Sequence, residues 1–238
     1  MYHILARKAM EDTFRHKGLR KKMVEDLLVR VEIEGLDRRT VAEKKRQVCR
    51  AIEEVPRHCF IDTAFDSFAY QDRAFPIGDG QTISQPSTVL AQSVLLDVAP
   101  GDKILEVGTG SGYQAMVLER LGAQVYTIER QKEVYLRTKQ LLQTMGSLVR
   151  TYFGDGYQGV PDEAPFDKIL ITCAAPEISV ALLNQLKPGG RLVVPVGQDE
   201  CEMTCIFKAA DGRLTRTRHG HFRFVPMLSK TSVPQYGK

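Results

Sequence analysis

Three glycines at alternate positions follow a short apolar run in residues 104–114, ILEVGTGSGYQ. Glycine lets a chain turn tightly and lets a ligand lie against the backbone, so Gly108, Gly110 and Gly112 predict a ligand-binding loop. The loop reads GxGxG, whereas the dinucleotide fingerprint reads GxGxxG, because Tyr113 stands in place of the last glycine. The spacing therefore favours a nucleoside ligand without a pyrophosphate.

Two acidic residues stand at the ends of the next two apolar runs. Glu129 closes the run 124–129, where a carboxylate can accept hydrogen bonds from both ribose hydroxyls. Asp155 lies between Gly154 and Gly156, where it can accept a hydrogen bond from an adenine amine while the glycines leave room for the ring. Alone, an acid at a strand end such as Glu129 is usually just solvated, and a GDG motif such as that around Asp155 is more often a simple turn. Together with the glycine loop, they predict S-adenosylmethionine as the ligand.

The stretch 76–86, PIGDGQTISQP, holds hydroxyl residues and glycines just before an apolar helical pattern. Its composition is typical of neither a strand nor a helix interior, so we expect a loop that leads into a helix beginning near Pro86, with Ser84 or Ser87 as the N-cap. A hydroxyl can also orient a substrate carboxylate without neutralising it. From the spacing alone, capping and substrate binding remain equally open for Ser84.

The residues around these motifs predict an alternation of strands and helices. Apolar residues at helical spacing predict N-terminal helices over 3–16, 20–34 and 40–54, followed by a stretch to residue 80 that is mostly loop. From residue 101 onward, the sequence predicts strands at 103–108, 124–129, 149–154, 168–173 and 191–197, with helices at 113–121, 131–145 and 178–186.

This alternation predicts an α/β fold, a doubly wound and mostly parallel sheet covered on both faces. Two strand-like runs around Asp211-Gly212 add a C-terminal antiparallel hairpin, and KPGGRL at 187–192 is expected to be a turn. We divide the chain into an N-terminal helical segment and loop, residues 1–80, packed on a catalytic domain, residues 81–238.

Composition limits the classes of function. Residues 1–50 hold 14 Lys and Arg against 8 Asp and Glu, but the charges alternate in sign, so we expect a solvated helix face and no nucleic-acid partner. The five cysteines form no CxxC pair and accompany no histidine cluster, so we expect no metal site and a reducing cytoplasm. No apolar run reaches transmembrane length and no signal peptide is recognised. We expect a monomer without a membrane partner.

The order of several motifs resembles the protein-L-isoaspartate (D-aspartate) O-methyltransferases of the bacterial type, which are Rossmann-like class I S-adenosylmethionine-dependent methyltransferases. The resemblance covers roughly residues 20–228. It rests on VPRHCF, PIGDGQTISQP, ILEVGTGSGYQ, GDG, APFDKILITCAAPEI, LKPGGRLVVPVG and FRFVP, in that order. GQTISQP upstream of VGTGSGYQ is the most specific of these combinations.

The resemblance implies that Ser84 is the active-site serine. It also implies a set of cofactor-binding residues, namely Thr82, Ile83, Ser84, Glu106, Gly108, Thr109, Gly110, Gly112, Glu129, Arg130, Asp155 and Gly156. Asp79 departs from the family pattern, because it adds a negative charge where an anionic substrate is expected. Arg57 or Arg223 is a candidate partner for it.

The implied activity is methyl transfer to the free α-carboxylate of isoaspartyl residues in damaged proteins and peptides. The methyl ester is a good leaving group, so a succinimide re-forms, and part of it hydrolyses to ordinary aspartate. The segment HFRFVP, residues 221–226, is implied to contact the substrate, and without the resemblance it would be an amphipathic edge strand. Cys173 is expected to be a small packed residue near the cofactor.

Other classes of function stay open at this point. An NAD-dependent oxidoreductase would share the sheet and Glu129, but the missing third glycine disfavours it. A relative that methylates ordinary aspartate in a dedicated partner peptide, an RNA methyltransferase, and a non-catalytic protein that binds S-adenosylmethionine are further alternatives. For an RNA methyltransferase, we find neither a catalytic cysteine motif nor an NPPY-like loop.

Overall fold

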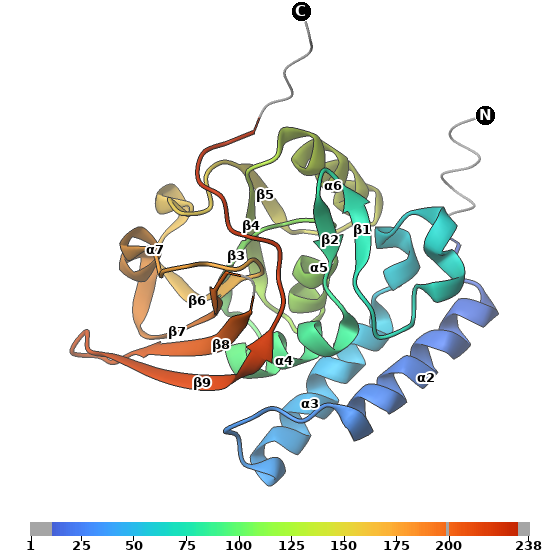
Figure 1. The fold of residues 1–238 in the computed structure, drawn as a ribbon, viewed down its shortest axis with the longest axis horizontal. Helices are drawn as coiled ribbons and strands as arrows, with labels where there is room; N and C mark the ends of the chain where they lie inside the picture. The colour runs from blue at the N-terminus through green and yellow to red at the C-terminus, as the bar shows by residue number, and fades with distance from the viewer. Residues whose placement is uncertain (1–10, 199, 233–238) are drawn as a thin grey trace, which may run out of the picture.

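A seven-stranded sheet forms the centre of the protein in a computed structural model that describes residues 11–198 and 200–232 (Figure 1). The strand order is β5-β4-β3-β6-β7-β8-β9, and the first five of these strands are parallel. Their bounds are Lys103–Val107 for β3, Gln124–Glu129 for β4, Arg150–Phe153 for β5, Phe166–Ile171 for β6 and Leu186–Gly197 for β7. The predicted doubly wound sheet is therefore confirmed.

The chain reverses direction of winding at β3. It runs outward from β3 to β4 and β5, and then returns to place β6 on the other side of β3. In open α/β sheets, ligands bind outside the carboxyl ends of the strands at such a switch point. The glycine loop follows β3, so it lies at this place in the fold.

Helices cover both faces of the sheet because successive strand residues point to opposite sides. Ile104 of β3 and Leu170 of β6 belong to the larger apolar cluster, whereas their neighbours Leu105 and Ile169 belong to the smaller one. The helices of this part are α4 (Pro86–Leu96), α5 (Tyr113–Arg120), α6 (Lys132–Thr144), α7 (Val180–Gln185) and the short 3₁₀-helix η3 (Pro161–Glu163).

The N-terminal part packs on α4 and α5 through one continuous core. The core contains Met23 of α2 (Phe14–Arg30), Ile52 of α3 (Arg38–Glu54), Leu96 and Met116. Division of the chain at residue 80 stays a prediction.

The expected helices over 3–16 and 20–34 are wrong within the described residues, where one helix runs from residue 14 to 30; residues 3–10 lie outside them. Thr13 caps this helix by accepting a hydrogen bond from the N–H of His16. A β-carbon at Gly18 would meet nothing within 4 Å, so this glycine lies in an open position and does not interrupt the helix. Residues 31–33, two of which are the β-branched Val31 and Ile33, then leave the helical conformation.

The stretch expected to be loop before residue 80 holds regular structure. It contains 3₁₀-helices η1 (Arg57–Phe60) and η2 (Thr63–Phe68) and an antiparallel hairpin of β1 (Phe75–Gly78) and β2 (Gln81–Ile83). Asp79 and Gly80 both have positive φ, 54° and 68°, and connect Gly78 to its partner Gln81. This is a two-residue hairpin turn of the Asp-Gly kind, so the hairpin is the physical reason for Asp79.

The C-terminal antiparallel ribbon is confirmed as β8 (Cys201–Lys208) and β9 (Leu214–Phe222), joined through Asp211-Gly212. The expected turn at 187–192 is wrong, because β7 begins already at Leu186. The register of β7 against β6 shifts between Phe166 and Lys168, and this irregularity accommodates the proline and glycines within the strand.

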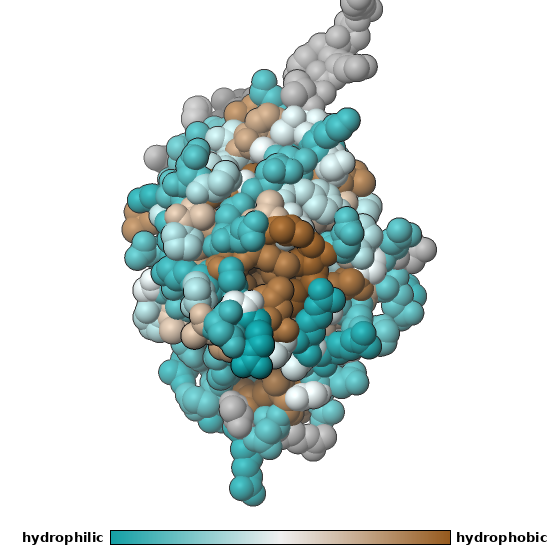
Figure 2. Space-filling view, turned by 90° about the vertical axis from the view of Figure 1, so that its left-hand side faces the viewer, coloured by the Kyte–Doolittle hydropathy of each residue, from teal (hydrophilic) through white to brown (hydrophobic). Residues whose placement is uncertain are grey.

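Exposed apolar side chains occur on α7 and on the β8–β9 ribbon, namely Val180, Phe207 and Leu214. Figure 2 shows an apolar area on the face that these elements share. Among the helices that the structure describes, none is both long and apolar enough to cross a membrane.

Candidate active site

The carboxyl ends of β3, β4 and β6 and the β1–β2 hairpin surround one pocket. Most of the residues predicted to bind the cofactor line it together: Thr82, Ile83, Ser84, Glu106, Gly108, Thr109, Gly110 and Glu129. Residues more than 20 positions apart in the chain thus meet at the switch point of the sheet. Gly112, Arg130, Asp155 and Gly156 do not line this pocket.

The glycine loop has the backbone that its sequence requires. Gly108 and Gly110 have φ values of 98° and 50°, in the left-handed region that favours glycine. A β-carbon on Gly110 would lie 3.7 Å from Cδ1 of Ile77 on β1, an ordinary contact, so at Gly110 the positive φ is what favours glycine. Gly112 is the N-cap of α5, and a β-carbon there would lie 2.8 Å from Cγ2 of Thr138. The absence of a side chain at Gly112 therefore lets the glycine loop pack closely against Thr138 of α6.

Helix α6 forms hydrogen bonds to both the glycine loop and the β1–β2 hairpin. The hydroxyl of Thr138 donates to the carbonyl of Gly110 at 2.6 Å. The neighbouring Arg137 donates from Nη2 to the carbonyl of Ile77 at 2.7 Å and lies 3.8 Å from a carboxylate oxygen of Asp79. The expected partners of Asp79 are therefore wrong, because the ion pair is with Arg137.

Glu129 ends β4 and its side chain is almost fully buried, at 5% exposure. Its Oε2 accepts a hydrogen bond from the N–H of Gly110 at 3.0 Å, and its Oε1 accepts one from the N–H of Gln131 at 2.9 Å. Each carboxylate oxygen can accept a second hydrogen bond. The side chain is thus held by the backbone in an orientation that suits two ribose hydroxyls.

Glu106 is fully buried in β3 at the base of the pocket. Its Oε2 accepts a hydrogen bond from the hydroxyl of Thr127 at 2.5 Å, whereas Oε1 has no hydrogen-bond partner. Burial raises the pKa of Glu106 to about 8, and the nearby charge of Glu129 adds to the rise. Gln114 Oε1, also in the lining, lacks a partner too. Two buried acceptors without donors call for a ligand that brings donors or positive charge.

Asp155 and Arg130 lie at the neighbouring strand ends, beneath the C-terminal segment. Asp155 accepts hydrogen bonds from the N–H groups of Tyr157 and Lys230, at 2.9 and 2.7 Å. Arg130 donates from Nε to the carbonyl of Lys230 at 2.8 Å. A β-carbon on Gly156 would lie 2.6 Å from Cγ1 of Val107, so only glycine fits there. The roles of Asp155 and Gly156 toward an adenine ring, and of Arg130 in cofactor binding, remain predictions.

Ser84 lies where this pocket meets a second cavity of about 350 Å³. Ser84, Thr82, Thr172 and Val225 line both cavities. Within the described chain, no hydrogen bond is formed by the Ser84 hydroxyl. The two cavities thus share a small group of residues. One of these residues is Ser84, whose hydroxyl is available to donate a hydrogen bond.

The predicted capping role of Ser84 or Ser87 is wrong. The N-cap of α4 is Gln85, whose side chain makes no capping hydrogen bond, and the N–H of Ser87 donates to Oδ1 of Asp72 at 2.8 Å. Pro86 occupies the first turn, as predicted.

Thr172 is a site residue that the sequence did not reveal. Strand β6 ends at Ile171, two residues earlier than expected, so Thr172 and Cys173 begin the loop at the carboxyl edge. Thr172 could have been identified from its position directly after a parallel strand. Cys173 lines the same pocket, and burial raises the pKa of its thiol to about 12, so it is a neutral packed side chain.

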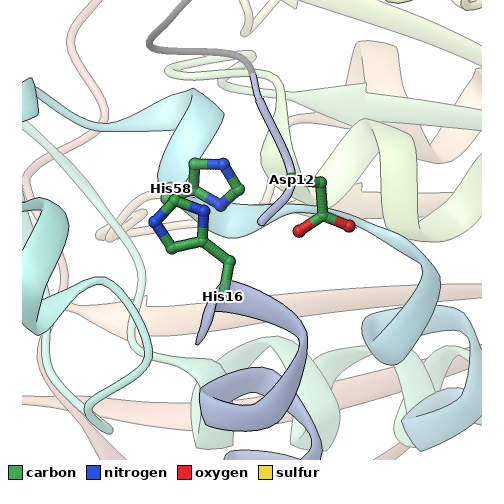
Figure 3. A group of neighbouring side chains, drawn as sticks. All are labelled: Asp12, His16 and His58. Carbon is green, nitrogen blue, oxygen red and sulfur yellow. The ribbon is translucent and has the colours of Figure 1, made fainter. Parts of the chain in front are cut away.

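A separate cluster of Asp12, His16 and His58 lies on the N-terminal part (Figure 3). The histidine rings stack with their centroids 3.8 Å apart. Every candidate metal-ligand atom already has a protein partner: Asp12 binds Arg20, His16 contacts Glu11 and Asp66, and His58 contacts Tyr70 and Cys59. These contacts dock the start of α2 onto η1 and η2.

A doubly wound sheet with a GxGxG loop, an acid ending the second strand and unpartnered acceptors at the switch point defines a class I methyltransferase that uses S-adenosylmethionine. Within this class, residues 31–232 match the family model Protein-L-isoaspartate(D-aspartate) O-methyltransferase (PCMT), so the chain belongs to that family. Family membership removes the oxidoreductase alternative.

Individual proteins agree with this assignment. The chain is 48% identical over 220 residues to the Protein-L-isoaspartate O-methyltransferase of Christiangramia forsetii, covering 92% of this chain and 98% of the relative. It is 47% identical to that of Flavobacterium psychrophilum, over the same shares. A solved protein-L-isoaspartate O-methyltransferase superposes with a TM-score of 0.74 at 26% identity, covering 87% of this chain and 65% of that one.

Proposed function

We propose that the protein transfers a methyl group from S-adenosylmethionine to the free α-carboxylate of isoaspartyl residues in proteins and peptides. The observation that carries this proposal is the position of Ser84 between two cavities. In this reading, the cofactor occupies the pocket around the glycine loop, and the isoaspartyl peptide occupies the second cavity. The acceptor carboxylate and the methyl group then meet beside Ser84.

The residues of the first pocket fit S-adenosylmethionine. The backbone of Gly108 and Gly110 allows close approach, Glu129 suits the ribose hydroxyls, and the unpartnered oxygens of Glu106 and Gln114 suit the methionine ammonium group. When bound, the cofactor supplies a methyl group on a positively charged sulfur. The positive charge of the ammonium group next to the buried Glu106 carboxylate stabilises that carboxylate in its ionised form.

Ser84 orients the acceptor in this mechanism. The substrate carboxylate is already ionised at neutral pH, so no general base has to remove a proton. The Ser84 hydroxyl donates a hydrogen bond to one carboxylate oxygen and leaves the other free to attack in line. Positioning of this kind, with water excluded by Phe224 and Val225 in the lining, lowers the barrier without changing the charge of the nucleophile.

The second cavity suits a peptide main chain. It is lined by consecutive residues His221 to Val225, at the end of β9 and beyond it, together with Gln85 and Thr88 at the start of α4. An extended peptide can pair with exposed backbone beside a strand, which gives affinity without selecting particular side chains. Isoaspartyl sites arise in many sequences, so such recognition fits repair of damaged proteins.

The methyl ester is the first step of repair. Methylation converts the carboxylate into a leaving group, the neighbouring backbone nitrogen closes a succinimide and releases methanol, and hydrolysis returns a fraction as ordinary aspartate. We further propose that the protein acts as a monomer in the cytoplasm. Its five cysteines are all free thiols, which fits a reducing compartment.

Two synthetic peptides that differ only in isoaspartate or aspartate at one position test the proposal. Labelled methyl transfer from S-adenosylmethionine should occur with the isoaspartyl peptide alone. Labelling of the aspartyl peptide, or of neither peptide when cofactor binding is intact, would contradict the proposal and favour a dedicated peptide substrate or another acceptor.

A further inference from the structure

The N-terminus of α4 is capped by a side chain from outside the helix. Pro86 has no N–H, and the N–H groups of Thr88 and Val89 donate to the carbonyl of Gln85. The remaining donor of this turn, the N–H of Ser87, reaches Oδ1 of Asp72 at 2.8 Å. A carboxylate at this end of a helix satisfies a free donor and also interacts favourably with the helix dipole.

A buried guanidinium anchors the backbone on both sides of Asp72. Arg57 is fully buried, and it donates from Nε to the carbonyl of Ala69 at 3.0 Å and from Nη2 to the carbonyl of Arg73 at 3.1 Å. These two acceptors stand on either side of Asp72 in the chain. Arg57 therefore fixes the loop that carries Asp72 toward the start of α4.

The cap has a direct consequence for Ser84. Ser84 stands one residue before the N-cap Gln85, so the first turn of α4 fixes where its side chain begins. Because the carboxylate of Asp72 accepts the capping hydrogen bond, the Ser84 hydroxyl is not needed as a cap for α4. The same contact that anchors the turn thus leaves Ser84 available to the two cavities.

We propose that Asp72 is a positioning residue for the methyl transfer, which acts by fixing Ser84 against the acceptor carboxylate. This proposal rests on the proposed function of Ser84. Asp72 does not line either cavity, so its effect on turnover has to pass through the turn at residues 84–87.

A double-mutant cycle tests whether the effect passes through Ser84. Asp72→Ala should lower kcat/KM for the isoaspartyl peptide about tenfold, since a small displacement of a positioning group is costly. In the Ser84→Ala background, the same change should alter kcat/KM by less than about twofold. Asp72→Asn should keep most of the activity, because asparagine also caps helices. Equal losses in both backgrounds, or no loss in either, would overturn the proposal.

Asp62→Ala is the matched control. Asp62 is another exposed aspartate that caps a neighbouring helical turn, since its Oδ1 accepts a hydrogen bond from the N–H of Ala64 at 2.8 Å. Loss of this cap should leave kcat/KM unchanged, and both single variants should bind S-adenosylhomocysteine with wild-type affinity. A parallel loss of cofactor affinity in Asp72→Ala would show a general structural role instead.

Amide hydrogen exchange separates this proposal from the proposed function. Exchange over residues 84–88 should be faster in Asp72→Ala than in wild type and unchanged in Asp62→Ala, whatever the substrate. If the wild-type protein methylates neither test peptide, the proposed function fails while faster exchange still supports the anchoring role of Asp72. Unchanged exchange at Ser87 overturns that role.

Discussion

The hydroxyl oxygen of Thr172 lies 2.7 Å from the carbonyl oxygen of Gly108, to which it donates a hydrogen bond, and it also donates to the carbonyl of Val107 at 3.1 Å. A β-carbon on Gly108 would lie 2.6 Å from that same hydroxyl oxygen. Thr172, the first residue after β6, therefore packs against Gly108, the first glycine of the loop after β3. The cofactor loop is held by a neighbouring strand end as well as by its own sequence.

Gly108→Ala should abolish measurable cofactor binding. The new methyl group would meet Thr172 at a distance that real side chains do not adopt, and the φ of 98° is unfavourable for alanine by about 1 kcal/mol or more. Gly101→Ala is the control, because Gly101 has a similar φ of 87° but nothing within 4 Å of the added carbon. Titration calorimetry with S-adenosylhomocysteine compares the two variants. Equal affinities in both would contradict the steric argument.

Ser84→Ala should lower kcat for the isoaspartyl peptide by about 10- to 100-fold, the usual scale for losing a positioning hydrogen bond. Its affinity for S-adenosylhomocysteine should stay within about twofold, because a hydroxyl facing the acceptor adds little to binding of the nucleoside. Ser87→Ala is the matched control, since the Ser87 hydroxyl lines neither cavity and should be dispensable. Steady-state kinetics and calorimetry measure both quantities, and full turnover by Ser84→Ala would refute the role.

The main elements of the site could be predicted because parallel strands share an edge. Gly108, Glu129 and Asp155 each follow or end a strand of one parallel sheet, so local patterns were enough to place them on the same side. The side-chain partners were not predictable in this way. Asp72 caps α4 from 15 residues away, and Thr172 reaches Gly108 across 64 positions. Such contacts depend on packing that no local spacing records.

The hairpin around Asp79 was missed for a different reason. Asp79-Gly80 is the same kind of turn dipeptide as Asp211-Gly212, which was recognised. The strands on either side of Asp79 are only four and three residues long, and β1 contains a proline, so the alternating pattern is too short to identify. The burial of Phe75 and Ile83 against the core holds these short strands in place.

The contribution of His58 to stability should decrease as the pH falls below about 6.5, opposite in sign to that of Glu106, whose raised pKa favours the fold as the pH falls. Burial lowers the pKa of His58, and the Coulombic effect of the neighbouring His16 lowers it further. A base with a lowered pKa in the folded state stabilises the fold above its unfolded pKa of about 6.5, and this contribution is lost as the pH falls toward the folded pKa. A single group of this kind changes the unfolding free energy by at most about 1.4 kcal/mol per pH unit.

Urea denaturation of wild type and His58→Gln between pH 7.5 and pH 5 measures this contribution. The carboxylates whose pKa is lowered, such as Asp12 and Asp97, titrate below this range. Glu106, with a pKa raised to about 8, contributes within this range, but it is present in both proteins, so its contribution cancels in their difference. The unfolding free energy of wild type minus that of His58→Gln should decrease from pH 7.5 to pH 5, whereas His221→Gln, a change at an exposed histidine, should follow wild type at every pH. A slope that His58→Gln leaves unchanged would assign the effect to other groups.

Cofactor affinity should rise with pH between about 6 and 7.5, because Glu106 must ionise to pair with the methionine ammonium group. Burial raises the pKa of Glu106 to about 8, so the carboxyl is mostly protonated at pH 6.5 before the cofactor binds. Binding then releases a proton, and the dissociation constant should fall close to tenfold for each pH unit in this range. Glu106→Gln should bind more weakly at pH 7.5 and lose the dependence on pH. Calorimetry in buffers of different ionisation enthalpy counts the released proton directly, and wild-type binding without proton release would mean that Glu106 stays neutral and serves only as a hydrogen-bonding group.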